Sequence, residues 1–335
     1  MKKKERVVSG IRPTGKIHLG NYIGTLRNWV EIQNNNVYDC FYFIADLHSL
    51  TTSYNNPISI GDNLIDMYID LLSVGLNPEK STIFLQSAIS GHYKLFLIYS
   101  MITPIGWLER NPTVKDMIRD YDIKDNVNYG LLGYPVLQAS DITLYKGNYV
   151  PIGKDQLPHL ELTREIVRRF NNIYGDFFPE PKEILSNTPY LLGLDGKKMS
   201  KSLGNTINIS ANNNEIWNVV KNAVTDPERV YKTDPGHPEI CNIFQYNKIF
   251  NFEKTETLKS DCINAKIGCM DCKKELSKVL TDTFKPIREK RIEIENDINH
   301  LENIKSLIFD GTEKAKKVAE ETINEIFDIF HMRLF

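Results

Sequence analysis

The sequence predicts an α/β fold in which a doubly wound parallel sheet is followed by a C-terminal all-helical domain. Short apolar and β-prone runs at residues 7–9, 40–45 and 82–86 alternate with helical spacing at 58–76. Strands that alternate with helices form parallel sheets with right-handed crossovers, and such sheets bind ligands at the carboxyl ends of their strands. After about Asn205 the strand pattern stops and only helical patterns follow.

The helical patterns place each element in order. Residues 58–76 carry apolar side chains at helical spacing, among them Ile60, Leu64 and Leu71. Pro286 lies inside the long pattern near the C-terminus, where it predicts a kink or a break. The other predicted elements are helices at 134–145, 155–170, 212–224, 273–294 and 312–330 and an extended piece at 149–152. We place the domain boundary between residues 207 and 208.

Bulk composition restricts the class of protein. The 335 residues are 41% apolar and 25% charged, which is ordinary for a globular chain of two domains. A formal charge of −2 gives no general attraction to nucleic acid, so any RNA contact needs local basic patches such as 2–6, 164–169 and 285–291. For the last patch, a solvated helix face is the preferred interpretation. We do not expect DNA to be a partner.

The N-terminus and the cysteines predict the cellular compartment. No apolar core follows the basic N-terminus, and no run approaches the roughly 18 apolar residues that a membrane span needs. Five cysteines, one of them isolated at Cys40 beside an apolar strand, do not make the disulfide framework of a secreted protein. We therefore expect a cytoplasmic protein without a membrane partner, in which Cys40 is a buried core thiol.

One polar segment follows the first predicted strand. Residues 12–21 read Arg-Pro-Thr-Gly-Lys-Ile-His-Leu-Gly-Asn. His18 supplies an imidazole, Gly20 permits close approach of the backbone, and Asn21 supplies an amide at the predicted start of a helix. The loop at the end of this strand is where a doubly wound sheet binds a nucleotide.

A second segment, at residues 197–202, reads Lys-Lys-Met-Ser-Lys-Ser and is flanked by glycines. Lys198 and Lys201 are three residues apart, so two ammonium groups can reach one polyphosphate from a mobile loop. A solvated turn is the alternative, and this motif alone is only moderate evidence. Together with residues 12–21, it describes the two sides of an ATP site.

Both segments match the signature sequences of class I aminoacyl-tRNA synthetases, and residues 9–24 resemble the tryptophanyl-tRNA synthetase family in particular. Leu19 stands where the commonest class I form has Ile, and Asn21 stands where it has a second His. Asn at that place is usual in the tryptophanyl family. Similar residues continue at 134–145 and 150–156, so the resemblance spans nearly the whole catalytic half.

This resemblance implies a Rossmann-like catalytic domain at residues 1–207, with signature loops at 13–21 and 198–202, and a helical anticodon-binding domain at 208–335. The implied activity joins L-tryptophan to ATP as tryptophanyl-adenylate, releases pyrophosphate, and transfers the acyl group to the 3′ end of tRNA(Trp). ATP and Mg²⁺ are the implied cofactors. The implied partners are tRNA(Trp), L-tryptophan and a second copy of the chain, because relatives are homodimers.

The resemblance also assigns residues to ATP. Stabilising charge on the departing pyrophosphate needs positioned donors, and His18, Asn21, Lys198 and Lys201 are the catalytic candidates. A plain surface arginine is the alternative for Arg12, and an N-cap is the alternative or additional role for Asp155. The implied ATP-binding residues are Arg12, Pro13, Thr14, Gly20, Asn21, Gly153, Lys154, Asp155, Leu191, Lys198, Met199, Ser200, Lys201 and Ser202.

A selective pocket for tryptophan needs one buried acceptor at the edge of an apolar cavity, because the indole ring has one N–H donor and no acceptor. Gln138 and Asp141 are three apart on a predicted helix, on the same face as Tyr134 and Tyr145. Asp141 is the candidate acceptor, and the resemblance gives its position the same role. The other implied pocket residues are His48, for which a core histidine is the alternative, Gln156 and, less securely, Val8.

Four of the five cysteines cluster at Cys241, Cys262, Cys269 and Cys272, with the spacing C-x20-C-x6-C-x2-C. Cytosolic disulfides do not persist, so four thiolates around a metal are the simplest cause. Structural zinc usually uses two close cysteine pairs, and only one is present here. The spacing resembles that of a bacterial subset of the family with a [4Fe-4S] cluster. We therefore expect [4Fe-4S], with Zn²⁺ or free thiols as the alternatives.

Three rival functions remain from the sequence. The sister tyrosyl enzymes have a related fold and could direct Asp141 to a phenol. A nucleotidyltransferase could share the His-x-Gly region, but it would lack the loop at 198–202 and the helical domain. An inactive paralogue that only binds RNA is disfavoured because His18, Asp141, Lys198 and Lys201 are all present.

Overall fold

The computed structural model describes residues 4–120, 127–153, 156–185, 191–197, 199 and 204–333. The chain divides into two compact units. We call Met1–Lys16, Thr25–Asn187 and Asn299–Phe335 the sheet unit, and Ile17–Gly24 and Thr188–Ile298 the helical unit.

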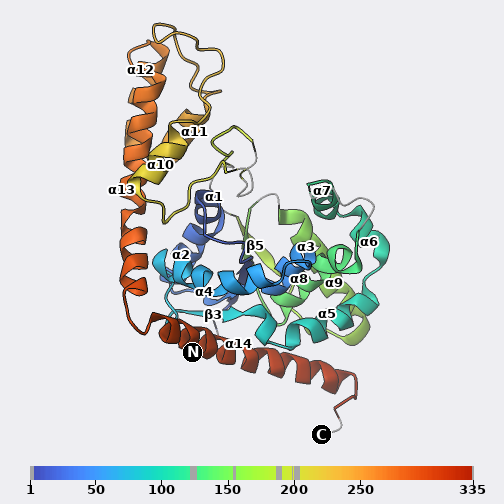
Figure 1. Ribbon diagram of the computed structural model, residues 1–335. Coiled ribbons are helices and arrows are strands. Elements are labelled where there is room, and N and C mark those ends of the chain that lie inside the picture. Colours follow the sequence, from blue (N-terminus) through green and yellow to red (C-terminus); the bar gives the residue numbers. More distant parts are fainter. Residues whose placement is uncertain are drawn as a thin grey trace. The chain divides into compact units, whose positions relative to one another are not determined.

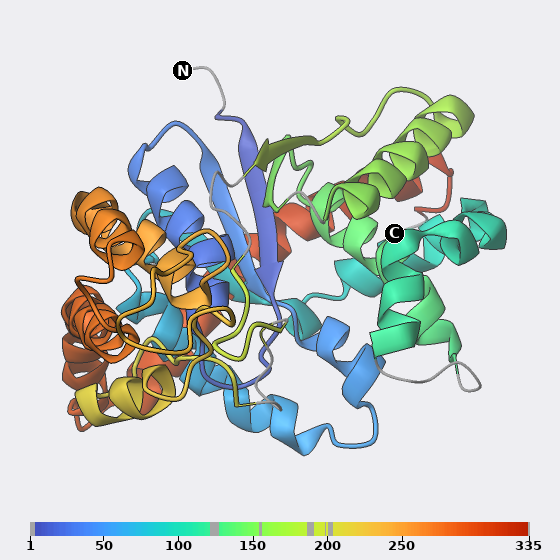
Figure 2. The same cartoon turned by 90° about the horizontal axis from the view of Figure 1, so that it is seen from above.

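The sheet unit contains a parallel sheet of β1 (Arg6–Ile11), β2 (Asp39–Ile44), β3 (Ser81–Leu85), β4 (Tyr149–Ile152) and β5 (Lys182–Leu185). The strands lie in the order β3-β2-β1-β4-β5, and every neighbouring pair is parallel. Figure 1 labels β3 and β5 of this sheet, and Figure 2 shows helices of the sheet unit on both faces of the sheet. The predicted doubly wound α/β fold is confirmed. β5 was not predicted, because this edge strand is mostly exposed and has no apolar run.

The strand order reverses beside β1, between its neighbours β2 and β4. Chain segments that leave β1 and β4 therefore diverge, and the carboxyl ends of these two strands border the crevice at the switch point. Arg12 directly follows β1, and Gly153 directly follows β4. The fold thus brings two predicted ATP-binding segments to one edge of the sheet.

Most helices of the sheet unit agree with the sequence pattern. The predicted helix at 58–76 is α4 (Ile58–Ser73), that at 134–145 is α8 (Tyr129–Thr143), and that at 155–170 is α9 (Leu157–Tyr174). The helices that the pattern did not predict are α2 (Arg27–Asn34), α3 (Asp46–Ser53), α5 (Gly91–Ile102), α6 (Ile105–Arg110) and α7 (Pro112–Asp120). The short 3-10 turn η2 (Gln86–Ala88) joins β3 to α5.

An aromatic core lies under the carboxyl half of the sheet. Tyr145, just after α8, stacks on Phe41 of β2 with ring centroids 5.2 Å apart and meets Phe84 of β3 edge-on at 5.1 Å. His92 of α5 lies against the same rings, 5.6 Å from Tyr145. These buried contacts fix α8 and α5 against the strands, which matters because both helices carry polar groups of the candidate site.

The helical unit contains α1 (Leu19–Asn21), α10 (Asn213–Val220), α11 (Asn242–Phe250), α12 (Thr255–Ile263) and α13 (Cys269–Glu295), with a 3-10 turn at Phe252–Lys254. Of the kink or break predicted at Pro286, the break does not occur, because α13 continues through this residue. Phe284 packs edge-on against Tyr22 at 5.5 Å and Phe250 at 5.9 Å. This packing outweighs the hydrogen bond that proline cannot donate.

The two units do not follow the predicted boundary between residues 207 and 208. The last helix, α14 (His300–Ile329), belongs to the sheet unit, where the Thr312 hydroxyl accepts a hydrogen bond from the Leu85 amide at 3.3 Å. Residues Ile17–Gly24 belong to the helical unit, because their backbone pairs with residues beyond the boundary. A scan for helical periodicity cannot detect either long-range return of the chain.

Gly311 tests the packing of α14. A Cβ atom at Gly311 would lie 2.0 Å from the Ile83 carbonyl oxygen, and a strand backbone cannot yield to it cheaply. Gly311→Ala should therefore lower the free energy of unfolding by roughly 1–3 kcal/mol in urea titrations. Gly61→Ala in α4 is the matched control, because a Cβ there meets nothing within 4 Å. Equal effects of the two substitutions would contradict the packing.

Candidate active site

His18 and Asn21 close the start of α1 with a reciprocal cap. The Gly20 N–H donates to His18 Nδ1 at 3.1 Å, and the His18 N–H donates to Asn21 Oδ1 at 3.4 Å. Because Nδ1 accepts, the neutral imidazole carries its proton on Nε2 and presents that edge as a donor. The Leu19 N–H also donates to the Ile207 carbonyl at 2.8 Å, which ties this segment to residues beyond the second signature.

The two signature segments meet within the helical unit. A Cβ atom at Gly20 would lie 2.7 Å from Met199 Sδ, so only glycine fits without displacing the methionine. Gly20 of the first segment is thus in close contact with Met199 of the second. Leu191, predicted to contact ATP, is buried in the same unit. Four predicted residues of the second segment, Lys198, Ser200, Lys201 and Ser202, lie outside the described residues, as do Lys154 and Asp155.

At the switch point of the sheet, Arg12 is held from one side. Its Nη2 donates to Thr52 Oγ1 of α3, while its Nε is buried without a hydrogen-bond partner in the described part of the chain. Burial raises the pKa of Tyr134, and the charge of nearby Arg12 opposes this rise. Arg12 is therefore a partly buried cation beside a pocket wall, which disfavours a plain surface arginine. Pro13 beside it is buried, and Thr14 is exposed.

Asp141 of α8 is a fully buried carboxylate at the centre of a hydrogen-bond cluster. His48 Nε2 of α3 lies 2.7 Å from its Oδ2, and His92 Nδ1 of α5 lies 2.7 Å from its Oδ1. The Gln86 amide nitrogen lies 2.8 Å from both oxygens. Gln86 Oε1 is buried and has no partner within the described residues. The carboxylate therefore receives four contacts from three side chains.

Tyr145 fixes the protonation of His92. Its hydroxyl lies 2.8 Å from His92 Nε2, and burial raises its pKa well above the usual value, so it stays protonated and donates. His92 Nε2 then accepts, which leaves the proton of the neutral ring on Nδ1, facing Asp141. The chain from Tyr145 through His92 to Asp141 thus has one consistent direction of donation.

The protonation of Asp141 follows from this cluster. Burial by itself raises the pKa of the Asp141 carboxyl, but the electrostatic interactions and hydrogen bonds with His48 and His92 outweigh burial and hold the pKa below its usual range. The group is therefore a carboxylate at neutral pH. Its oxygens only accept hydrogen bonds, so a ligand that donates to it must displace one of these four contacts.

The predicted pocket residues lie in different places. The Tyr134 hydroxyl lies 2.7 Å from His159 Nε2, and its ring meets His48 edge-on with centroids 6.4 Å apart. Gln138 is half-buried on α8, and Gln156 is partly exposed at the start of α9. Val8 is fully buried in the main core cluster.

Sequence reasoning missed Gln86, His92 and His159. Gln86 ends the predicted strand at 82–86 and His92 follows it, at the edge where parallel sheets bind ligands, and this position was the available signal.

The four clustered cysteines line one cavity of the helical unit, together with Arg229, Phe244 and other residues. Arg229 Nη1 lies 3.9 Å from Cys262 Sγ, and Asn247 Nδ2 lies 3.7 Å from Cys272 Sγ. Within the described residues, no three or more His, Cys, Asp or Glu side chains are arranged to hold a metal ion. The cysteines are therefore gathered but not set as ligands. The fifth, Cys40, is buried in β2, as predicted.

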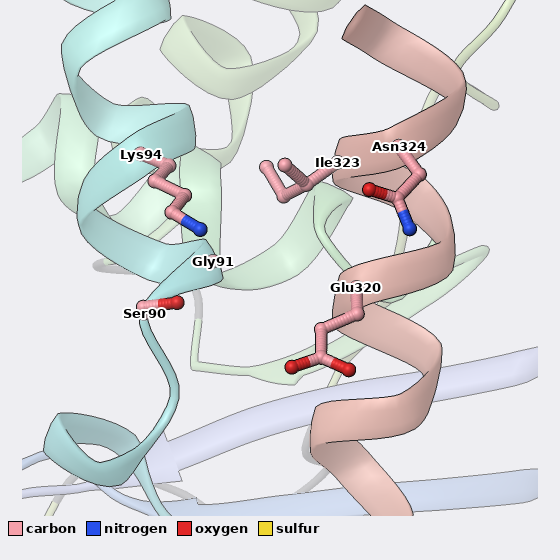
Figure 3. A pocket seen from close by; sticks show the side chains of 6 residues that line it. All are labelled: Ser90, Gly91, Lys94, Glu320, Ile323 and Asn324. Carbon is pink, nitrogen blue, oxygen red and sulfur yellow. The ribbon is translucent and has the colours of Figure 1, made fainter. Parts of the chain in front are cut away.

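One further groove contains no residue that the sequence predicted for a site. A shallow groove between α5 and α14 is lined by Ser90, Gly91, Lys94, Glu320, Ile323 and Asn324 (Figure 3). The lysine, glutamate and asparagine that border it are exposed, and none was predicted for a site. Among the described helices, none is long and apolar enough to cross a membrane.

The basic patches considered for RNA are largely neutralised. Arg164 pairs with Glu161 and Glu183, and Arg168 pairs with Glu180. In α13 the Lys285 and Arg291 side chains each face a glutamate four residues later, at 3.8 and 2.8 Å. The solvated helix face that we prefer for the last patch holds for Lys285, whose side chain is 62% exposed, but not for Arg291, whose side chain is 7% exposed.

Replacement of His92 tests the carboxylate cluster. Because the folded-state pKa of Asp141 is depressed, its ionised form stabilises the fold above the unfolded pKa of about 4, and this contribution is lost as pH falls through the folded pKa. His92→Phe should raise the Asp141 pKa, move acid unfolding to higher pH, and cost about 1.5–3 kcal/mol at pH 7. Urea unfolding from pH 3 to 8 measures both effects. Exposed His331→Gln is the control, and an unchanged acid midpoint in His92→Phe would refute the cluster.

Comparison with known proteins agrees with this geometry. Residues 1–285 match the family model described as tRNA synthetases class I (W and Y). A tryptophan–tRNA ligase of Thermotoga maritima is 44% identical over 323 residues, covering 96% of this chain and 97% of its own. One from Aquifex aeolicus is 39% identical and covers 96% and 98%.

A solved structure, the tryptophanyl-tRNA synthetase of Campylobacter jejuni complexed with ADP and tryptophan, is similar with a TM-score of 0.83 and 33% identity. It covers 97% of this chain and 99% of its own. The chain therefore belongs to the tryptophan and tyrosine family of class I tRNA synthetases.

Proposed function

We propose that the chain is a tryptophan–tRNA ligase that activates L-tryptophan with ATP and transfers it to the 3′ end of tRNA(Trp). Its relatives carry this name over nearly their full length. The observation that supports the substrate most directly is the buried Asp141 carboxylate, which is kept ionised at the carboxyl edge of the sheet. The chain is an enzyme of the AMP- and pyrophosphate-forming class.

Activation needs little proton transfer from the protein. The tryptophan carboxylate attacks the α-phosphate of ATP, the bond to the β-phosphate breaks, and pyrophosphate leaves with Mg²⁺ sharing its charge. Donors that are already in position for the departing charge therefore supply most of the catalysis. We assign this role to His18 Nε2–H and the Asn21 amide in the first segment and to Lys198 and Lys201 in the second.

The remaining residues that we assign to ATP follow strands β1 and β4 in the sequence. Arg12 and Gly153 directly follow β1 and β4, which end at the switch point where doubly wound folds bind nucleotides. Arg12 has a buried Nε without a partner in the described chain, so it can donate to a phosphate or to the activated carboxylate. We assign Pro13, Thr14, Lys154 and Asp155 to the same nucleotide from the sequence.

Asp141 selects tryptophan by accepting a hydrogen bond from the indole N–H. A carboxylate offers about four lone-pair positions, and the four contacts from Gln86, His48 and His92 already use them. An indole N–H must therefore replace one donor. His48 is the candidate because its side chain is 12% exposed, whereas that of His92 is fully buried. We propose that His48 swings away from Asp141 Oδ2 when tryptophan enters, between walls that include Tyr134, Gln138, Gln156 and, less directly, Val8.

Amino-acid-dependent ATP–pyrophosphate exchange distinguishes a tryptophan enzyme from the rival, a sister tyrosyl enzyme. We expect exchange with tryptophan and much less with tyrosine, because a phenol is smaller than an indole and carries its donor at a different place on the ring. Exchange with tyrosine but not tryptophan would refute the proposed substrate. Charging of tRNA(Trp) by the same preparation excludes an inactive paralogue that only binds RNA.

We also propose that the chain is a homodimer. Tyr93, Leu97 and Met101 are spaced four residues apart on α5 and are 51%, 56% and 73% exposed, so they form an apolar stripe on one helix face. Ile105 at the start of α6 continues it. A second copy of the chain suits such a self-complementary apolar patch.

Substitution in this stripe tests the dimer. Leu97→Glu places a charge in the proposed interface and should convert dimer to monomer in sedimentation-velocity experiments at micromolar concentration. Ile58→Glu is the matched control, because Ile58 is equally apolar and exposed in the same unit but lies outside the stripe. A wild-type monomer, or a Leu97→Glu dimer of unchanged affinity, would contradict the proposal.

For the cysteine cavity, we propose a [4Fe-4S] cluster held by Cys241, Cys262, Cys269 and Cys272, with Zn²⁺ as the alternative. The donor set supports it, since four thiols line one cavity and N–H groups of Arg229 and Asn247 approach two of the sulfurs, as happens around iron–sulfur clusters. The thiols would close around the metal when it binds, because they are not set as ligands without it. The cluster would supply structural order to the surrounding loops.

Metal analysis separates the alternatives. Protein purified without oxygen should be brown and contain iron and sulfide in a 1:1 ratio, and Cys269→Ser should lose both. Colourless protein with stoichiometric zinc would support the zinc alternative, and metal-free protein with four titratable thiols would exclude both.

The helical unit is the proposed anticodon-binding part. Its residues up to Ile298 carry the cysteine cavity, whereas α14 is packed in the sheet unit, so we assign the anticodon to residues 208–298 rather than to 208–335. Translation uses tRNA in the cytoplasm, which is where we expect the enzyme to act.

A further inference from the structure

The second signature segment starts from a tight turn. The Gly193 N–H donates to the Lys197 carbonyl at 2.6 Å, and the Gly196 N–H donates to the Gly193 carbonyl at 2.9 Å. Gly196 has a φ of +77°, which glycine adopts without strain. The Leu194 N–H donates to the Asn205 carbonyl at 2.9 Å, so the chain before the segment is hydrogen-bonded to the chain after it. We call Leu192, Gly193, Leu194 and Asn205 the neck.

Two side chains of helix α11 donate hydrogen bonds to one side of this neck. The Tyr246 hydroxyl donates to the Leu192 carbonyl at 2.6 Å, and Asn242 Nδ2 donates to the Gly193 carbonyl at 2.8 Å. The two donors are four residues apart, so they share one face of α11. Tyr246 is 1% exposed and Asn242 is 8% exposed, so water does not readily replace either bond.

Further close contacts restrict the movement of the neck. A Cβ atom at Gly193 would lie 2.4 Å from Asn205 Nδ2, which shows how closely the two sides of the neck approach. Asn205 Nδ2 also donates to Asp195 Oδ1 at 2.8 Å. Helix α11 also packs on α13, where Phe250 meets Phe284. A rigid pair of helices therefore carries the base of the loop.

Because catalysis by the loop lysines depends on position, the base of the loop sets how productively they reach ATP. A displacement of about 1 Å in a positioning element can cost on the order of 100-fold in rate. We propose that Asn242 and Tyr246 are positioning residues for ATP activation, acting through the Leu192 and Gly193 carbonyls on Lys198 and Lys201. This inference rests on the proposed role of those lysines.

Two isosteric variants test the inference. Tyr246→Phe removes one hydroxyl, and Asn242→Asp replaces a donor with an acceptor that faces a carbonyl. Each should lower kcat/KM for ATP in pyrophosphate exchange by roughly 10- to 100-fold, with the Kd for tryptophan within twofold of wild type. Tyr42→Phe is the matched control, since its buried hydroxyl also donates to a backbone carbonyl, that of Trp29, in the sheet unit.

A double-mutant cycle separates positioning from stability. In a Lys201→Ala background the loss caused by Tyr246→Phe should shrink, because the lysine that it positions is absent. Trypsin should also cleave at the loop lysines about 10-fold faster in Tyr246→Phe than in Tyr42→Phe, because one hydrogen bond at the base is lost. Additive losses in the cycle, or loop effects no larger than those of Tyr42→Phe, would overturn the inference.

The two proposals can fail separately. If wild-type protein does not exchange with tryptophan, the proposed function fails, while the trypsin comparison still reports whether α11 restrains the loop. If exchange occurs and Tyr246→Phe behaves as Tyr42→Phe, only the positioning role fails.

Discussion

A buried negative charge is the constraint on which the sheet unit depends. Asp141 has no contact with solvent, so its ionised form must be stabilised by neighbours or the pKa would rise. His48, His92 and Gln86 provide that stabilisation from three different elements, α3, α5 and the turn after β3. Removing one partner would leave a buried charge with less compensation, which costs more than losing an ordinary hydrogen bond.

This requirement explains the packing around the site. The aromatic core that holds Tyr145 against Phe41 and Phe84 also orients His92, so the same contacts position an apolar core and a polar acceptor. The helical unit brings together two segments that are far apart in the sequence. Its two signature segments meet at Gly20 and Met199, and the backbone of the first segment is tied to Ile207. The first signature segment and the ring acceptor are thus each held by contacts within one unit.

The sequence predicted those parts that local pattern or motif determines. Alternation of strands and helices identified the fold class, and the need of an indole N–H for one buried acceptor selected Asp141 as the candidate. Gln86 and His92 were missed because a lone glutamine and a lone histidine carry no spacing signal, and only the sheet brings them to α8. β5 was missed because an exposed edge strand needs no apolar residues. The return of α14 to β3 and the unbroken helix at Pro286 are tertiary effects, which override local preference.

The central claim is that Asp141 recognises the indole N–H, and a substrate analogue tests it most directly. 3-Benzothienylalanine keeps the shape of tryptophan but replaces N–H with sulfur. Wild-type protein should prefer tryptophan by on the order of 10⁴-fold in kcat/KM for exchange, and Asp141→Asn should reduce that preference by at least about 100-fold. If Asp141→Asn discriminates between the two amino acids as well as wild type does, Asp141 is not the group that reads the ring.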